Sequence, residues 1–188
     1  MVSFQDTLDY LLRHARMEAN IATYGNIFEK TGTKPVIITG TSGSGKTTVV
    51  KKILARVNPN PVFVVDVSDE YNEYEKVGLG KILGTTQFEK NTHVRFVPHA
   101  DSRICAAQCE AVFQHINLIK TSGNLRNLIV VVEEAHRFEK SENLKALAID
   151  ARKFLRKLII ITTNWKPYAE TSHRYFVRPH GNFKSFRR

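Results

Sequence analysis

The stretch Gly40-Thr41-Ser42-Gly43-Ser44-Gly45-Lys46-Thr47 decides the fold of this chain. It fits the pattern G-x-x-x-x-G-K-[ST] at every position. It follows the apolar run PVIITG (35–40) and opens the helix-like stretch TSGSGKTTVVKKILARV (41–57). When a glycine-rich turn joins a strand to a helix, the backbone N–H groups of the turn can wrap a triphosphate. The sequence therefore predicts a phosphate-binding loop between a buried strand and a helix.

The residue types of this loop suit the chemistry of ATP and Mg²⁺, which we expect as cofactors. Glycine at positions 43 and 45 lets the backbone approach the phosphates, where a side chain would obstruct it. Lys46 can reach the β- and γ-phosphates, and the Thr47 hydroxyl can ligate Mg²⁺. The predicted nucleotide-binding residues are Gly40, Thr41, Ser42, Gly43, Ser44, Gly45, Lys46, Thr47 and Thr48.

Apolar runs alternate with helix-like segments along the rest of the chain. Such a pattern predicts an α/β fold, in which helices on both faces bury a mostly parallel sheet. The expected strands lie within residues 35–40, 61–71, 93–98, 127–134 and 158–164. The expected helices are 4–30, the helix that the glycine-rich loop opens within 41–57, 101–120 (capped by Asp101 or Ser102) and 141–157 (started by Ser141), with a helix fragment and a loop in 71–92.

Composition bounds the class of protein. Of 188 residues, 42% are hydrophobic and 24% charged, which excludes a disordered, collagen-like or coiled-coil chain. Cys105 and Cys109 are the only cysteines, which we expect to pack as thiols. A metal site that joins them to His93 and His99 fits no common zinc spacing. Because no apolar run approaches roughly 20 residues and no basic signal segment is present, we expect a soluble cytoplasmic protein without a transmembrane segment.

Positive charge is concentrated toward the C-terminus. The chain has 28 Lys and Arg against 18 Asp and Glu, a net charge of +10, and residues 145–188 alone hold 11 basic and two acidic residues. Basic side chains alternate there with Tyr175, Phe176, Phe183 and Phe186, which suits a polyanion or a groove on a partner subunit. A basic tail without a partner is the alternative.

Two consecutive glutamates end the apolar run NLIVVVEE (127–134). Adjacent strand residues point to opposite sides, so Glu133 and Glu134 should have different roles. We assign Glu133 to Mg²⁺ and Glu134, as general base, to the water that attacks the γ-phosphate. A pair of acids that favours a helix start is the alternative. We expect His136 to pack or hydrogen-bond rather than to catalyse.

Polar residues also end two other strands. Asn164 could hydrogen-bond the γ-phosphate or the water, although an ordinary turn residue explains it equally well. We expect Asp66 and Glu70 to tune the water site or to pair with a neighbouring basic group. All these side chains would meet at the carboxyl edge of the sheet, where parallel sheets bind their ligands.

Four segments, taken in order, resemble motifs of the HerA/FtsK superfamily of P-loop ATPases. They are the phosphate loop, VDVSDEY (65–71), VVVEEAHRF (130–138) and ARKFLRKLIIITTN (151–164). Asp69 stands where the family has Gly, Glu133 where it has Asp, and Asn164 where it has Gln. The resemblance implies a RecA-like (ASCE) P-loop NTPase core with an extra catalytic glutamate, and ATP hydrolysis coupled to translocation of double-stranded DNA.

The resemblance also implies a ring, usually a hexamer, with ATP between subunits. Arg152 matches the family's arginine in its R-K-F stretch, and would reach across to stabilise the charge of phosphoryl transfer. An exposed helix arginine is the alternative. Arg156, Arg174 and Arg178 are the other candidates. The predicted catalytic residues are Lys46, Glu134, Arg152 and Asn164.

We divide the chain into an N-terminal helical segment (1–34), a P-loop ATPase core (35–165) and a basic C-terminal tail (166–188). Such a bare core resembles the genome-packaging ATPases of viruses with internal membranes, including archaeal icosahedral ones. This implies a motor that drives double-stranded DNA into a preformed capsid, in the host cytoplasm or on the virion, with capsid or membrane-associated virion proteins as further partners. A motor should contact DNA phosphates rather than bases. Candidates are Lys76, Lys81, Lys90, Lys120 and Arg126.

Two other classes of protein remain open. A P-loop nucleoside or nucleotide kinase would need an acceptor pocket and a mobile arginine-rich lid, and it has no need of a strand that ends in Glu-Glu. A nucleotide-dependent switch, or a DNA ATPase without a packaging role, would bind DNA or a capsid protein without translocating. The switch would need Lys46 but would tolerate Glu134→Gln.

Overall fold

The computed structural model describes residues 31–56, 60–120, 125–163, 173–177 and 183–186. The strands are β1 (Val36–Thr39), β2 (Val62–Val65), β3 (Glu75–Lys76), β4 (His93–Phe96), β5 (Ile129–Val132), β6 (Lys157–Thr162), β7 (His173–Val177) and β8 (Phe183–Phe186). The helices are α3 (Lys46–Leu54), α4 (Leu79–Leu83), α5 (Ser102–Ile119) and α6 (Glu142–Phe154), with a 3-10 helix η2 (Ala135–Phe138).

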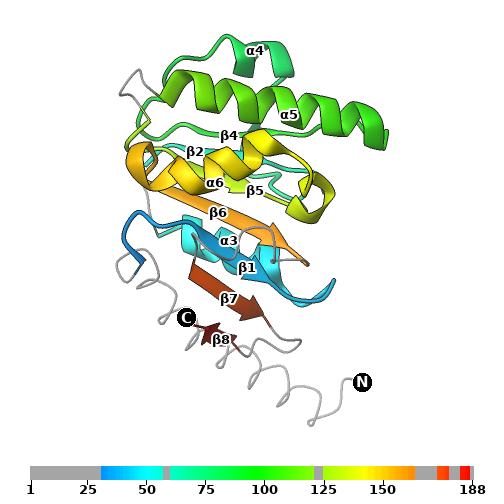
Figure 1. Ribbon diagram of the computed structural model, residues 1–188, viewed down its shortest axis with the longest axis vertical. Coiled ribbons are helices and arrows are strands. Elements are labelled where there is room, and N and C mark those ends of the chain that lie inside the picture. Colours follow the sequence, from blue (N-terminus) through cyan, green and yellow to red (C-terminus); the bar gives the residue numbers. More distant parts are fainter. Residues whose placement is uncertain (1–30, 57–59, 121–124, 164–172, 178–182, 187–188) are drawn as a thin grey trace, which may run out of the picture.

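These strands form one sheet in the order β3-β4-β2-β5-β6-β1-β7-β8 (Figure 1). Every neighbouring pair is parallel except β7 and β8, which pair antiparallel. Strand β6 lies between β1 and β5, so the phosphate loop and the Glu-Glu pair follow strands that are two positions apart. The predicted α/β class with a mostly parallel sheet is confirmed.

Side-chain alternation along the strands creates two cores, one on each face of the sheet. In β5, Val130 and Val132 belong to the core that α5 and α6 cover, whereas Ile129 and Val131 belong to the core that α3 covers. Because both faces are buried, the central strands β2 and β5 are apolar throughout, as is usual for parallel strands between helices. The alternation also decides which face each residue at a strand end will meet.

The two long helices begin at capping residues. The Asp101 side chain accepts hydrogen bonds from the backbone N–H groups of Arg103 and Ile104, at 2.9 and 3.2 Å. Ser141 Oγ accepts from the backbone N–H of Leu144 at 2.9 Å. Each cap satisfies donors that the first turn of a helix leaves free. The predicted starts of these two helices are confirmed.

Two sequence-based expectations need correction. The helix predicted over 141–157 runs too far, because α6 ends at Phe154 and Lys157 is the first residue of β6. The sequence also predicts only five strands and none after residue 164, yet β3, β7 and β8 join the sheet. Strand β3 has only two residues, and β7 depends on pairing with β1, which the local sequence does not reveal.

Other expectations lie outside the described residues. These are the helix over 4–30 and the residue Asn164. The division of the chain into three segments also stays a prediction. In the described part of the chain, no helix combines the length and hydrophobicity needed to cross a membrane.

Candidate nucleotide-binding site

The turn between β1 and α3 has a conformation that its glycines permit. Gly43 and Gly45 have φ angles of 72° and 89°, in the left-handed region that side chains disfavour. Lys46 is the first residue of α3 and is only 7% exposed, and its Nζ donates to Thr41 O at 2.9 Å. This contact places the ammonium against the turn, next to the free N–H groups of the helix start. A positive charge beside such donors makes an anion-binding site.

The next residue, Thr47, contacts the end of β5. Thr47 Oγ1 donates to Glu133 Oε1 at 2.9 Å, although 86 residues separate them in the sequence. Strand alternation explains the meeting, because Glu133 continues the face of Ile129 and Val131, which α3 covers. The structure thus brings together the two residues that the sequence assigns to Mg²⁺.

The Glu133 carboxylate suits a divalent cation. It is 2% exposed, and burial raises its pKa to about 7, against the lowering effect of the Thr47 hydrogen bond. Its Oε2 is buried and has no hydrogen-bond partner among the described residues. A carboxylate and a hydroxyl are hard oxygen donors of the kind that Mg²⁺ prefers, so the residues present fit the ion. Thr47 and Glu133 would hold it, and it would neutralise charge on the β- and γ-phosphates.

Glu134 has different surroundings from its neighbour. Its φ of 48° turns the chain out of β5 and into η2, and its side chain is 33% exposed. Its Oε2 lies 3.4 Å from His136 Nε2. An accessible carboxylate directly after a buried one gives the site one group able to reach a water molecule and one able to hold a cation. The roles themselves stay predictions.

Asp66 lies fully buried at the end of β2. Its carboxylate accepts hydrogen bonds from Arg95 Nη1 at 2.9 Å and from the backbone N–H groups of Glu70 and Tyr71 at 2.9 and 3.0 Å. Arg95 also pairs with Asp69, whose φ is 55°. Of the two expectations for Asp66, pairing with a basic group is the one observed.

Sequence reasoning missed Arg95 as the partner of Asp66. It stands in the otherwise apolar strand HVRF, where it is 7% exposed. Because a charged side chain in a buried strand requires an opposite charge, this position was itself a signal.

The structure does not bring Arg152 to the phosphate loop of its own chain. Arg152 is exposed on α6, which packs on the face of the sheet opposite α3. Both alternatives for this arginine, a role across a subunit boundary and an ordinary surface charge, therefore remain. Asn164 lies outside the described residues.

Among the described residues, no three His, Cys, Asp or Glu side chains gather as metal ligands, and Cys105 and Cys109 are buried free thiols.

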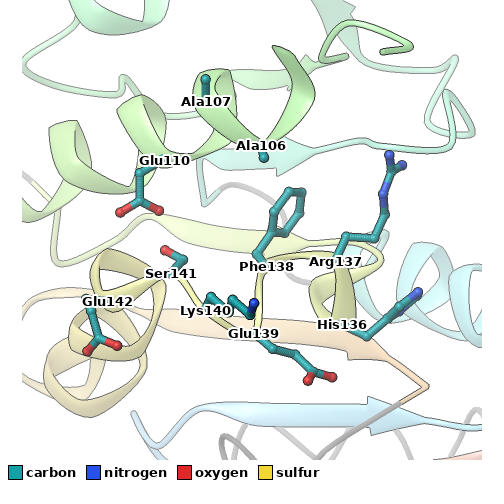
Figure 2. A pocket seen from close by; sticks show the side chains of 10 residues that line it. All are labelled: Ala106, Ala107, Glu110, His136, Arg137, Phe138, Glu139, Lys140, Ser141 and Glu142. Atoms are coloured by element: carbon teal, nitrogen blue, oxygen red, sulfur yellow. The ribbon is translucent and has the colours of Figure 1, made fainter. Parts of the chain in front are cut away.

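A cavity of about 660 Å³ lies beside η2 (Figure 2). Three residues of α5 line it, together with the segment 136–142. Figure 2 shows Phe138 directed toward Ala106 of α5, with the side chains of His136 and Arg137 at one end of the cavity. None of the predicted nucleotide-binding residues lines this cavity, so it is separate from the phosphate loop.

A phosphate loop hydrogen-bonded to a carboxylate two strands away, in a mostly parallel sheet with helices on both faces, defines a P-loop NTPase of the RecA-like, ASCE class. Residues 30–166 match the model of the AAA domain family, and this match covers more than half of the chain. The chain belongs to that family, whose members are nucleotide-binding P-loop ATPases. No curated protein matches the chain.

Proposed function

We propose that this ATPase is the motor subunit of a double-stranded DNA translocase that packages a viral genome into a preformed capsid. The hydrogen bond between Thr47 and Glu133 is the observation that carries the ATPase chemistry, since it links the phosphate loop to the Glu-Glu pair. Support for the DNA-translocating part is the ordered set of motifs that resembles the HerA/FtsK superfamily, together with the basic charge of residues 145–188.

The residues divide the hydrolysis between them. The loop amides and Lys46 bind the phosphates, while Thr47 and Glu133 hold the cation site. Glu134 orients a water toward the γ-phosphate and accepts its proton as the bond to phosphorus forms. In a ring, Arg152 of one subunit stabilises the charge that spreads over the transferred phosphoryl group at the next.

The candidate DNA contacts differ in how much charge they can offer. Lys81 Nζ lies 2.8 Å from Glu75 Oε1, and Lys120 Nζ lies 3.2 Å from Asp150 Oδ2, so both charges are partly neutralised. Lys76, Lys90 and Arg126 have exposed side chains. We therefore expect the second group to contribute more to phosphate binding than the first.

The test is the rate of phosphate release with and without linear double-stranded DNA, alongside the mass of the protein in solution. We expect DNA to stimulate release, a mass well above that of one chain, and loss of release in Lys46→Ala. DNA affinity should fall steeply as salt rises, because each phosphate contact releases a counterion. Release that ignores DNA would contradict translocation, and transfer of the γ-phosphate to a nucleoside would indicate a kinase instead.

A further inference from the structure

Tyr71 lies in the core between the sheet and α3, on the face of the sheet toward which Glu133 points. Its side chain is fully buried and packs in the same cluster as Ile129 and Val131, the residues that lead to Glu133 on that face. The Tyr71 hydroxyl is buried without a hydrogen-bond partner among the described residues, and so is Glu133 Oε2. One group is a donor and the other an acceptor, and buried polar groups are rarely left unpaired.

Printed contacts place the two side chains at neighbouring strand ends. The backbone N–H of Glu133 donates to Val65 O at 3.1 Å, and the next residue of that strand end, Asp66, accepts from the backbone N–H of Tyr71 at 3.0 Å. Thr47, which donates to Glu133, and Lys51, which lies over the Tyr71 ring, are four residues apart and therefore share one face of α3.

We propose that Tyr71 is a positioning residue of the cation site, whose hydroxyl donates to Glu133 Oε2 and so holds Oε1 toward Thr47. The inference rests on the proposed role of Glu133 and adds to it a residue from a different strand end. A carboxylate oxygen has two lone pairs, so this bond leaves Oε2 able to accept a further contact from the cation or its water shell. Groups that orient a ligand in this way contribute to metal affinity without touching the metal.

The surroundings of Tyr71 hold its ring in place. Its backbone N–H donates to Asp66 Oδ2 at 3.0 Å. Lys51 of α3 places its Nζ 5.1 Å from the centre of the ring, and the same ammonium donates to Glu70 O and to Glu73 Oε2, the latter at 3.0 Å. The turn that carries Tyr71 is therefore fastened both to β2 and to the helix of the phosphate loop.

Tyr74 provides a matched control. Its ring centre lies 5.9 Å from that of Tyr71, and its side chain is half-buried where Tyr71 is fully buried. Burial and Glu73 raise its pKa to about 12, with no contribution from Glu133. Replacing either tyrosine by phenylalanine keeps the ring and removes only the hydroxyl, so a side chain that merely fills space tolerates the change.

The test is Mn²⁺ binding, followed by electron paramagnetic resonance, to the 188-residue chain with a non-hydrolysable ATP analogue. We expect Tyr71→Phe to weaken Mn²⁺ about tenfold and Tyr74→Phe to stay within about twofold of wild type. Affinity for the metal-free nucleotide should be unchanged in both. Wild-type Mn²⁺ affinity in Tyr71→Phe would overturn the inference.

Two further variants keep the outcome interpretable. Lys51→Met changes a side chain that is 31% exposed, which the fold should tolerate, and it should weaken Mn²⁺ by a smaller factor through the loosened ring. Unchanged affinity there would count against the positioning network even if Tyr71→Phe did not fold. Glu133→Gln tests the underlying site: if it too binds Mn²⁺ normally, the proposed cation site fails, whereas loss in Glu133→Gln alone refutes only the role of Tyr71.

Discussion

Glu133 and Glu134 show how backbone geometry gives neighbouring residues different surroundings. Glu133 directly follows β5 with its side chain against α3, whereas the left-handed φ of Glu134 turns the next carboxylate toward the solvent. Their exposed fractions, 2% for the Glu133 residue and 33% for the Glu134 side chain, express that difference. The division of roles predicted for the two glutamates requires such a difference in their surroundings.

The first prediction concerns Glu134. In Glu134→Gln we expect ATP to bind within a few-fold of wild-type affinity but to be hydrolysed at least about 100-fold more slowly, because the amide cannot accept the proton of the attacking water. A fluorescent nucleotide measures binding, and phosphate release measures turnover. Glu142→Gln, at an exposed side chain of α6, is the control and should hydrolyse normally. Near-normal turnover in Glu134→Gln would favour a nucleotide switch.

At the scale of single elements, charged residues in buried strands fix the strand ends. Arg95 of β4 neutralises Asp66 at the end of β2, and that carboxylate in turn fixes the backbone of Glu70 and Tyr71. Lys157 of β6 holds the segment before β1 through Thr31 Oγ1 at 2.8 Å, Lys34 O at 3.2 Å and Gly32 O. Each contact joins elements that the sequence separates.

We predict that Arg95→Met lowers the free energy of unfolding by about 3 kcal/mol, because it leaves the buried Asp66 charge without its counterion. Urea unfolding measures the change. The matched control is Lys81→Met, which breaks the ion pair with Glu75 where both side chains are 64% exposed. That loss should stay below about 1 kcal/mol. Equal stability of the two variants would show that Asp66 does not need Arg95.

The buried amine of Lys157 gives a prediction about pH. Burial, and then the charge of Arg156, lower its pKa to about 8 from the ordinary lysine value of 10.5. Between these two pH values the unfolded chain binds a proton that the folded chain has released, so the free energy of unfolding should rise with pH. The slope is at most about 1.4 kcal/mol per pH unit. Below pH 8 the charged amine is a constant cost.

Lys157→Met should remove this slope, which unfolding curves at several pH values between 8 and 10 would reveal. Lys153→Met, at a side chain that is 65% exposed, is the control and should keep the wild-type slope. A slope that persists unchanged in Lys157→Met would assign the pH dependence to another group.

At the scale of the whole molecule, the sheet separates the phosphate loop from Arg152. Helix α3 lies on one face of the sheet and α6 on the other (Figure 1). The side chain of Arg152 is exposed on α6, so the sheet stands between it and the phosphate loop of its own chain. If Arg152 acts in hydrolysis, a neighbouring subunit must receive it.

We predict that Arg152→Ala lowers hydrolysis on the order of 10³-fold in assembled rings, the typical contribution of an arginine supplied in trans. Mixing Arg152→Ala with Lys46→Ala subunits should restore measurable activity, because some interfaces then combine an intact loop with an intact arginine. Lys153→Ala changes the adjacent exposed cation and should be nearly silent. A mixture no more active than its components would argue that Arg152 is an ordinary surface charge.

Much of this protein follows from its sequence alone. The sequence predicts the phosphate loop, the caps at Asp101 and Ser141 and the buried strands. Each of these features depends on residues within a few positions of one another. Hydrophobic periodicity, glycine conformations and capping side chains act over that range. The order of strands and helices, and hence the α/β class, could be inferred from such local signals.

Only the tertiary structure decided which distant groups meet. Strand order decides the bond from Thr47 to Glu133 and the pairing of Arg95 with Asp66. It also decides that Tyr71 shares a core with Ile129 and Val131 and that β7 lies beside β1. A strand carries the same local pattern wherever it stands in the sheet. Its neighbours are chosen by the packing of the whole sheet between its helices, which no short stretch of sequence encodes.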